Sequence, residues 1–523
     1  MELTTKGRYA VMAMADLAGH ADEGAIALSV VAERQNLPLA YLEQIFVPLR
    51  RAGLVESARG RSGGYRLAKP AADISIAAVM AAVEEDTRFT RCSHNDPRCS
   101  AATPCVTHWL WTALGESMGQ FLTSVNLSDV IAGGRYSSAP AFAAAAGRMT
   151  GKRTYLDYNA TAPLRPEAKA EMIAALDVPG NPSSVHAEGR RARSVVESAR
   201  ESVARLIGAK PSEIVFTSGA TEANNWAIAQ PWATILTSGT EHDSILAPAR
   251  AARAEVIMLP LDRNGVIDVQ EFTASILSRE FAGSSLLALQ FANNETGVVQ
   301  PVAEIAALAR ERGIAVHTDA VQAAGRMPID FAALGVETLA LSAHKLGGPK
   351  GVGALVIRDH IDLVPSIRGG GQERRRRAGT ENVAAIAGFG AAAEAALRDL
   401  EAVAAIQALR DELEAGIKRI SPEAVIIGEG AQRLANTTAV ALPGKLAETL
   451  VIRLDLACIA VSAGSACSSG KVGASHVLEA MGLGHDIAAG TIRVSLGPTT
   501  TKDDIAAFLT AWTGIAGAPA LAA

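Results

Sequence analysis

Thr338-Leu-Ala-Leu-Ser-Ala-His-Lys345 is a short apolar run that ends in a hydroxyl, an imidazole and an amine within four residues. The run predicts a buried β-strand, and a lysine at the end of such a strand is costly to keep charged without a partner. Two interpretations are open for Lys345. Its amine reaches outward to water, which is the commoner outcome for a single lysine, or it forms a Schiff base with a carbonyl.

The composition predicts a soluble globular protein of several domains. The chain has 523 residues, 49% hydrophobic and 20% charged, with a formal net charge of -5, so it has no overall attraction to nucleic acid or membranes. Lys6, Arg8 and Asp16 interrupt the N-terminal apolar pattern, so this stretch is not expected to be a signal peptide. We therefore expect a cytoplasmic protein. The uncharged run 505–523 contains Thr, Gly and Pro and has no basic flank, which favours a last helix over a membrane span.

Apolar strand-like runs alternate with helical patterns after residue 154. They begin at Ile214, Thr234, Val256, Leu286, Ile314, Leu339 and Ala354. Continuous apolar strands between helices predict an α/β fold with a parallel sheet covered on both faces. Functional sites in such sheets lie at the carboxyl ends of the strands.

Polar residues follow several of these strands. Thr217-Ser-Gly-Ala-Thr221 is a strand, a glycine turn and a helix start, which offers backbone N–H groups and a hydroxyl to a phosphate. His242 follows the next strand, and its imidazole could stack on a ring and move protons, although a single such histidine is more often an ordinary loop residue. Asp319 and Gln322 could hold a pyridine nitrogen protonated and hydrogen-bond the phenolic oxygen of the same ring.

Each of these groups has an ordinary structural alternative, but the set in this order predicts a pyridoxal phosphate site with Lys345 as the Schiff-base lysine. The resemblance is then plain. Motifs from Tyr155-Leu-Asp-Tyr-Asn-Ala-Thr-Ala-Pro163, through Ser218-Gly-Ala-Thr-Glu-Ala-Asn-Asn225 and Asp319-Ala-Val-Gln322, to Ser462-Ala-Gly-Ser-Ala-Cys-Ser-Ser-Gly470 resemble cysteine desulfurases of the fold-type I, long-loop class in the class V aminotransferase family.

The resemblance implies a role for each matching residue. Lys345 bears the cofactor, His242 stacks on it and shuttles protons, and Cys467 is the nucleophile. The implied cofactor-binding residues are Ala220, Thr221, His242, Asn294, Asp319, Gln322, Ser342, His344, Lys345 and Thr380, and the implied substrate carboxylate ligands are Asn294 and Arg493. Thr380 reaches the phosphate of a partner subunit in this family, which implies a homodimer.

Cys467 lies in a stretch rich in glycine and serine, which permits a mobile loop. A thiolate there would take the sulfur of L-cysteine as a persulfide, leave alanine, and pass the sulfur to an acceptor or scaffold protein. Cys458 lies in an apolar run and is expected to be an inert core cysteine. Another fold-type I enzyme, such as a selenocysteine lyase or an aminotransferase, would not need Cys467 for sulfur transfer.

The first 135 residues have a different pattern. A helix over 3–17, a helix capped by Ser29 and ending at Gln35, and a third starting near Leu39 predict a helix-turn-helix, and residues 55–67 predict a wing. Six basic residues against one acid between Arg50 and Lys69 favour double-stranded DNA as partner, with a protein-docking winged helix as the alternative. The predicted DNA contacts are Tyr41, Glu43 and Gln44 on the third helix and Arg59 on the wing.

Three cysteines and a histidine follow the wing within 17 residues, namely Cys92, Cys99, Cys105 and His108. Their spacing predicts a metal site and leaves zinc and an iron–sulfur cluster equally open. These residues, together with Tyr41-Leu-Glu-Gln-Ile-Phe46 and Gly63-Gly-Tyr65, resemble the bacterial iron–sulfur cluster regulator family of winged-helix transcription factors. That resemblance implies a DNA-binding dimer with a [2Fe-2S] cluster on the four residues.

Together the two resemblances imply a multidomain chain. Residues 1–135 form a mainly α winged helix-turn-helix domain, and 136–152 a linker. Residues 153–523 form an α/β fold-type I pyridoxal phosphate-dependent transferase with a large domain at about 167–415 and a smaller C-terminal α+β domain from the flanking segments. The expected function is cysteine desulfuration coupled to iron–sulfur-responsive transcription. The alternative is a transcription factor whose second half is mainly structural or sensing.

Overall fold

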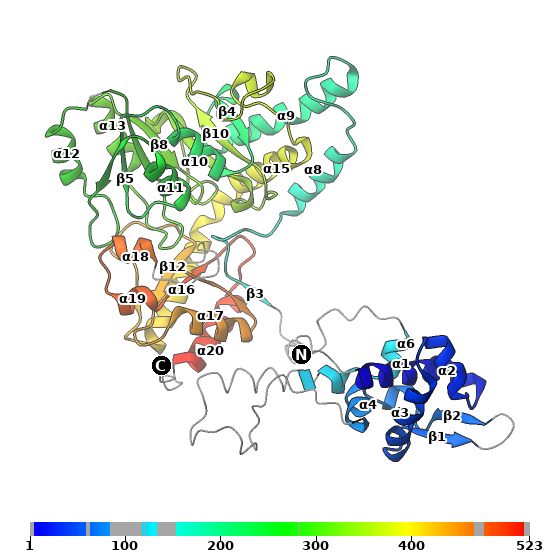
Figure 1. Ribbon diagram of the computed structural model, residues 1–523. Coiled ribbons are helices and arrows are strands. Elements are labelled where there is room, and N and C mark those ends of the chain that lie inside the picture. The colour runs from blue at the N-terminus through cyan, green and yellow to red at the C-terminus, as the bar shows by residue number, and fades with distance from the viewer. Residues whose placement is uncertain are drawn as a thin grey trace. The chain divides into compact units, whose positions relative to one another are not determined.

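The computed structural model describes residues 5–58, 63–83, 118–119, 121–132, 153–281, 283–464 and 475–516. The chain separates into two compact units, Met1–Gly151 and Lys152–Ala523 (Figure 1). The expected linker, residues 136–152, lies outside the described residues, so its bounds and those of the large domain stay predictions. In the described part of the chain, no helix has the length and apolarity needed to cross a membrane.

The first unit begins with three helices, α1 (Thr5–Gly19), α2 (Leu28–Gln35) and α3 (Leu39–Arg51). Asn36, with a φ of 53°, ends α2 in the left-handed conformation and turns the chain toward α3. The helices share a core that includes Met14, Leu17, Val31, Leu42, Ile45, Phe46 and Leu49. The helix-turn-helix prediction is therefore confirmed, but Ala27 rather than Ser29 is the N-cap of α2.

The predicted wing is also present. The strands β1 (Val55–Ala58) and β2 (Gly64–Leu67) pair antiparallel, and the helices α4 (Ile76–Ala82) and α6 (Leu127–Ile131) complete the described part of the unit. Gly64 is required where β2 meets the backbone at Ile26, because a Cβ there would lie 2.3 Å from the Ile26 carbonyl.

The second unit is built on a seven-stranded sheet with the order β4-β10-β9-β8-β7-β5-β6. Its strands are β4 (Ile214–Thr217), β5 (Thr234–Ser238), β6 (Glu255–Leu259), β7 (Ser285–Gln290), β8 (Ala315–Asp319), β9 (Thr338–Ser342) and β10 (Gly353–Ile357). Strands β9, β8, β7, β5 and β6 are parallel, so their carboxyl ends share one edge.

The prediction of a wholly parallel sheet is wrong at β10. This strand pairs antiparallel with both β9 and β4. Only residues 343–352 connect β9 to β10, and they contain a single short 3-10 turn (Ala343–Lys345). A parallel return needs a crossover of a dozen residues or more, usually a helix, so the short connection reverses the strand. Strand β4 points the same way as the parallel strands, because it is antiparallel to β10.

Alternate side chains of the strands enter different cores, because neighbouring residues of a strand face opposite sides of the sheet. One face packs against α9 (Ala187–Leu206), α12 (Val269–Leu277), α13 (Val302–Glu311) and α15 (Val383–Asp399). The opposite face packs against α10 (Ala220–Ile228) and α11 (Asp243–Ala251). The sheet is thus covered by helices on both sides, as the apolar strands predict.

A smaller layer follows. The strands β11 (Val425–Ile426), β12 (Thr437–Ala441), β15 (Thr491–Ser495) and β14 (Ser462–Ala463) form an antiparallel sheet in this order. Its core contains residues of α16 (Val403–Ile420), α17 (Ala447–Leu456) and the last helix, α20 (Lys502–Ala516). The first strand of the unit, β3 (Thr154–Tyr155), pairs in parallel with β13 (Ile459–Ala460) in this layer.

A buried ion pair joins two distant parts of the large layer. Arg200 of α9 donates to both carboxylate oxygens of Glu373, at 2.8 and 3.0 Å, and Glu373 also accepts the N–H of Phe216 at 3.0 Å. Glu373, Arg374 and Arg375 are three consecutive residues with positive φ, at 44°, 57° and 67°. Such a turn is unfavourable for residues with a Cβ, so we infer that the contacts of Glu373 hold it.

We therefore expect Glu373→Ala to destabilise the second unit by about 3–5 kcal/mol, because it removes the buried counter-charge of Arg200 and leaves only the more exposed Glu197 as its partner. The measurement is a urea titration followed by circular dichroism. Glu255→Ala is the matched control, because the partner of Glu255 is the exposed Arg279, and its effect should stay below about 1 kcal/mol. Similar losses in the two variants would contradict a structural role for the buried pair.

Candidate active site

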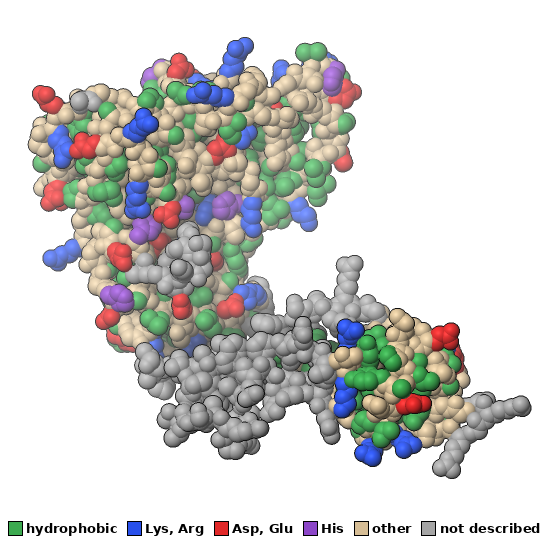
Figure 2. All heavy atoms as spheres, in the orientation of Figure 1, with side chains coloured by type: hydrophobic (Ala, Val, Ile, Leu, Met, Phe, Trp, Pro, Cys, Tyr) green, Lys and Arg blue, Asp and Glu red, His purple; other side chains and the backbone are tan. Residues whose placement is uncertain are grey.

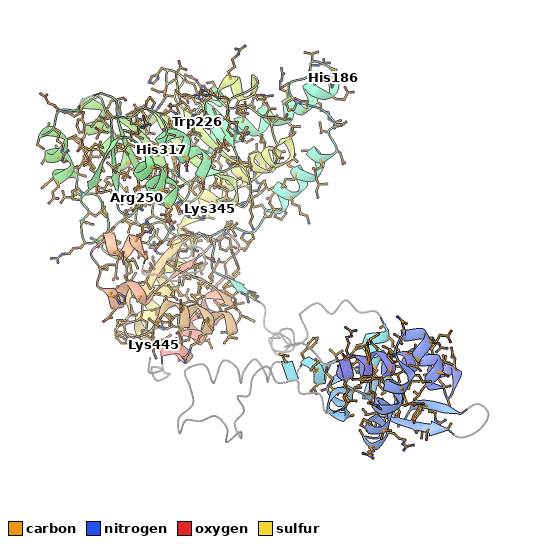
Figure 3. All side chains as sticks on the ribbon, viewed as in Figure 1. His186, Trp226, Arg250, His317, Lys345 and Lys445 are labelled. Carbon is orange, nitrogen blue, oxygen red and sulfur yellow. The ribbon has the colours of Figure 1, made fainter. Side chains whose placement is uncertain are left out.

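A cavity of about 600 Å³ lies at the carboxyl ends of the parallel strands. Nearly all residues to which the sequence assigns a cofactor or substrate role line it: Ala220, Thr221, His242, Asn294, Asp319, Gln322, Ser342, His344, Lys345 and Arg493. Most come from the large layer, whereas Arg493 comes from β15 of the smaller layer. Lys345 lies where the two layers meet (Figure 3).

One end of the cavity is suited to a phosphate. Helix α10 begins at Ala220 and points the N–H groups of its first turn toward this end, with Thr221 beside them. Ser342 and His344 line the same cavity from the end of β9. Burial lowers the pKa of His344 to about 4, with further lowering by the positive charges of Lys345, Lys350 and Arg326, so this imidazole is neutral at pH 7.

Asp319 ends β8 and lies among fixed hydrogen-bond donors. Its Oδ1 accepts the N–H of Val321 at 3.0 Å, and its Oδ2 accepts Nδ2 of Asn224 at 2.7 Å. Asn224 therefore presents its oxygen to His317, at 2.9 Å from Nε2, so that His317 must carry its proton on Nε2. Nδ1 of His317 then accepts the hydroxyl of Thr338 at 2.8 Å.

His317 is completely buried inside the large layer (Figure 3). Burial lowers its pKa to about 3, so it stays neutral and keeps the tautomer that orients Asn224 and, through Asn224, Asp319. The sequence analysis did not assign Asn224 or His317. Asn224 lies within a motif used for the resemblance, and His317 lies two residues before Asp319, so both face the side of β8 that Asp319 faces.

His242 lies at the N-terminus of α11, where its Nδ1 accepts the N–H of Ser244 at 3.1 Å and lies 2.8 Å from the Ser244 hydroxyl. The neutral ring therefore carries its proton on Nε2. The preceding residue, Glu241, is completely buried, and burial raises its pKa to about 8 despite hydrogen bonds from Gln290 and Ser238. Glu241 thus adds little negative charge beside His242 at pH 7.

The amine of Lys345 does not extend outward to water. It donates to the backbone oxygens of Asn159 and Ala160 at 2.5 and 3.0 Å. Gln322 donates from Nε2 to the same Asn159 oxygen at 3.1 Å. Lys345, expected at the Schiff-base linkage, and Gln322, expected at the ring oxygen, thus bind the same backbone carbonyl. This carbonyl belongs to Asn159, in a motif from which the sequence analysis took no site residue.

Arg493 is almost fully buried and lines the cavity from β15. Its guanidinium donates to Asp157 at 2.7 Å and to the backbone oxygen of Asn294 at 3.1 Å. Its Nε is buried and has no hydrogen-bond partner among the described residues. A guanidinium with donors to spare in a cavity is a natural ligand for a carboxylate.

Several predicted residues are not part of this cavity. Thr380 is exposed on the loop before α15 and does not line it. Cys467, Cys92, Cys99, Cys105, His108 and Arg59 lie outside the described residues. Cys458 does not lie in the core as expected. It is half-buried at the end of α17, with a φ of 66°, because its backbone makes the turn into β13.

In the first unit, Glu43 and Gln44 are exposed on α3, whereas the ring of Tyr41 is half-buried and packs edge-on against Tyr9, with the ring centroids 5.7 Å apart. Arg66 on the wing pairs with Glu56 at 2.6 Å, whereas Arg50, Arg51 and Lys69 of the same basic stretch are exposed and form no ion pair with another described residue. On the face of the second unit drawn in Figure 2, basic and acidic side chains are interspersed.

Comparison with known proteins gives two family matches. The model described as Aminotransferase class-V matches residues 154–508, and the model described as Iron-dependent Transcriptional regulator, Rrf2, matches residues 3–133.

The similar proteins cover the second unit. A protein named cysteine desulfurase from Cereibacter sphaeroides is 44% identical over 68% of this chain and 93% of its own length. The cysteine desulfurase NifS of Azotobacter vinelandii is 42% identical over 67% of this chain and 89% of its own length. The solved structure of a NifS-like protein from Rickettsia africae is 35% identical, with a TM-score of 0.65 over 70% of this chain and 99% of its own. The fold-type I expectation is thereby confirmed.

The low pKa of His317 predicts a pH dependence of stability. Below pH 6.5 this histidine binds a proton in the unfolded chain but not in the folded chain. The free energy of unfolding therefore falls as the pH decreases from 6.5 toward 3. The contribution is at most about 1.4 kcal/mol per pH unit. His317→Gln should be less stable at pH 7 but lose stability less steeply in acid, as measured by urea titrations at several pH values. His360→Gln, at an exposed site, should retain the wild-type slope, and equal slopes in all three proteins would contradict this assignment.

Proposed function

The chain belongs to the class-V aminotransferase family as one of its cysteine desulfurases, behind a unit of the Rrf2 regulator family, and from this premise we propose what its sites do. The second unit removes sulfur from L-cysteine, releasing L-alanine and holding the sulfur as a persulfide on Cys467 for iron–sulfur cluster assembly. The first unit binds double-stranded DNA in response to an iron–sulfur cluster. The observation that carries the enzymatic part is the convergence of Lys345, Asp319, His242 and Arg493 on one cavity.

The residues of the cavity fit pyridoxal phosphate. The N-terminus of α10, Thr221, Ser342 and His344 would hold its phosphate, Asp319 its pyridine nitrogen, Gln322 its ring oxygen, and Lys345 its carbonyl carbon. Asp319 suits this role because Asn224 and Val321 fix both of its oxygens. When bound, the cofactor supplies an electron sink for bond cleavage at the substrate Cα.

The protein side chains then orient the substrate and move protons. Arg493, with an unused Nε, and Asn294 bind the carboxylate of L-cysteine. His242 would stack on the ring and transfer protons through Nε2, since its Nδ1 is engaged by Ser244. Glu241 and His317 are both uncharged at pH 7, so the charges that line the cavity are those of Lys345, Lys350 and Arg493 and of Asp319 and Glu222.

Cys467 completes the reaction as a nucleophile. Its thiolate attacks the substrate sulfur, the S–S bond of a persulfide forms, and the bond between Cβ and sulfur breaks. Protons return to the carbon skeleton to give L-alanine, so no external oxidant or reductant is needed. An acceptor protein then removes the sulfur. We propose that the enzyme is a cytoplasmic homodimer in which Thr380 contacts the phosphate in the partner subunit.

Cys467→Ala should abolish the release of L-alanine and sulfide from L-cysteine, with a loss of about 100-fold or more, because the persulfide cannot form. Cys458→Ala is the matched control, since Cys458 is the other cysteine of the same unit and lies at the end of α17. It should retain the wild-type rate. Alanine is measured by chromatography and sulfide by methylene blue formation in the presence of a thiol reductant.

Full activity of Cys467→Ala on L-selenocysteine but not on L-cysteine would favour a selenocysteine lyase. No release of alanine or sulfide by the purified yellow wild-type protein would contradict the enzyme and favour a structural or sensing role for the second unit.

For the first unit we propose that Cys92, Cys99, Cys105 and His108 bind a [2Fe-2S] cluster. The support is the winged-helix fold around α3 and the match to an iron-dependent regulator family. In this proposal Tyr41, Glu43 and Gln44 contact the major groove and Arg59 the DNA backbone or minor groove. Tyr41 would contribute its hydroxyl, because its ring packs against Tyr9.

We further propose that Cys467 supplies sulfur to this cluster. Apo-protein incubated anaerobically with Fe²⁺, L-cysteine, pyridoxal phosphate and a thiol reductant, which reduces the persulfide sulfur to sulfide, should develop the visible absorption of a [2Fe-2S] cluster, and Cys467→Ala should not. Added sulfide should restore the cluster in Cys467→Ala, which shows that its ligands are intact. Equally fast cluster formation from L-cysteine in both proteins would contradict direct supply, and no cluster in either with sulfide would favour zinc at the four ligands.

A further inference from the structure

Arg326 lies between two cavities of the second unit. It follows the turn that carries Asp319 and Gln322, and its side chain lines a second cavity of about 490 Å³. Lys345 lines both this cavity and the one proposed to bind the cofactor, whereas Gln322 lines only the latter. Arg326 is therefore separated from the cofactor cavity by the side chain of Gln322.

The guanidinium of Arg326 is bound by oxygens that carry no full charge. Its Nη1 donates to the side-chain oxygen Oε1 of Gln322 and, at 3.3 Å, to the backbone oxygen of the same residue. Its Nη2 donates to the backbone oxygen of Tyr158 at 3.1 Å. Among the described residues, none of the carboxylates forms an ion pair with it. Burial lowers its pKa to about 9, with a smaller effect from Arg493, so it remains mostly charged at pH 7.

These contacts permit one orientation of the Gln322 amide. A guanidinium can only donate hydrogen bonds, and the backbone carbonyl of Asn159 can only accept them. The side-chain oxygen must therefore face Arg326, and the NH₂ group must face Asn159, as observed at 3.1 Å. In a flipped amide the NH₂ group would face the N–H donors of Arg326, and the oxygen would face the carbonyl of Asn159, so neither hydrogen bond could form. One N–H of Gln322 is used by Asn159, and the other stays available on a side chain that lines the cofactor cavity.

We propose that Arg326 is a positioning residue that locks the Gln322 amide with an N–H directed at the ring oxygen of the cofactor. The proposal rests on the proposed pyridoxal phosphate site and deepens it. A locked donor stabilises the ionised ring oxygen, and a buried cation disfavours a second positive charge on the neighbouring Lys345 nitrogen. Both effects lower the pKa of the linkage between Lys345 and the cofactor.

Other charged groups also face Lys345, and they stay unchanged in the comparison below. From the elements around the two cavities these are Arg165, Glu167, Glu222, His242, Asp319, His344, Lys350, Asp399 and Arg493. The effect of Arg326 is separable from theirs, because among the charged side chains of the described residues only that of Arg326 hydrogen-bonds the side chain of Gln322.

The test is a pH titration of the visible absorption of the purified holoprotein, without substrate. In Arg326→Met the pKa of the linkage should rise by about one unit or more. Arg326→Lys keeps the charge and a donor, so its pKa should stay within about 0.3 unit of the wild type. Arg358→Met is the matched structural control. Arg358 also holds backbone carbonyls, those of Val336 and Phe331, but it lines neither cavity, so its loss should lower the melting temperature without moving the pKa.

A double-mutant cycle with Gln322→Ala separates positioning from charge alone. If Arg326 acts through Gln322, Arg326→Met should shift the pKa clearly less in the Gln322→Ala background than in the wild type. Equal shifts in the two backgrounds, or a wild-type titration of Arg326→Met, would overturn the proposal. If Arg326→Met does not accumulate in folded form, Arg326→Gln takes its place with the same two outcomes. A protein that binds no pyridoxal phosphate at all would instead contradict the proposed function.

Discussion

The active cavity depends on the hydrogen bonds of one buried residue, Asn159, in a turn of the segment that joins the smaller layer to the large one. Its side chain binds Thr437, Asn436 and the backbone oxygen of Asn294, and its N–H binds Ser495. Its own carbonyl accepts Lys345 and Gln322. Both layers are thus tied to the residue that sets the position of the lysine amine, and a shift of one layer would move the amine relative to Arg493 on the other.

The electrostatics of the cavity follow from selective burial. His317, His344 and Glu241 are titratable, but burial keeps all three uncharged near pH 7. The remaining charges that line the cavity are Lys345, Lys350 and Arg493 against Asp319 and Glu222. A cavity with this excess of positive charge suits ligands that carry a phosphate and a carboxylate. The uncharged groups still act, because a neutral imidazole has one donor and one acceptor and so fixes the orientation of its neighbours.

Much of this arrangement could be predicted from the sequence. The strand ends identify His242, Asp319, Ser342 and Lys345, because polar and titratable side chains come directly after apolar runs there. The parallel strands bring those ends to one edge. The reversal of β10 was missed, because apolar patterns contain no strand direction. Asn159 and Arg326 were missed because their roles depend on contacts with Lys345 and Gln322 that form only in the folded chain. Cys458 was misplaced because a hydrophobic neighbourhood does not reveal a left-handed turn.

The position of Arg493 has a consequence for synthesis of the protein. It belongs to β15, which pairs with both β12 and β14, so the central strand of the smaller sheet is made last. The first unit has its own core and precedes this strand by hundreds of residues. Domains fold as they emerge during translation. On the ribosome the regulator unit can therefore be complete while the catalytic cavity still lacks its guanidinium, so each chain can fold its regulatory unit before it can process a molecule of cysteine.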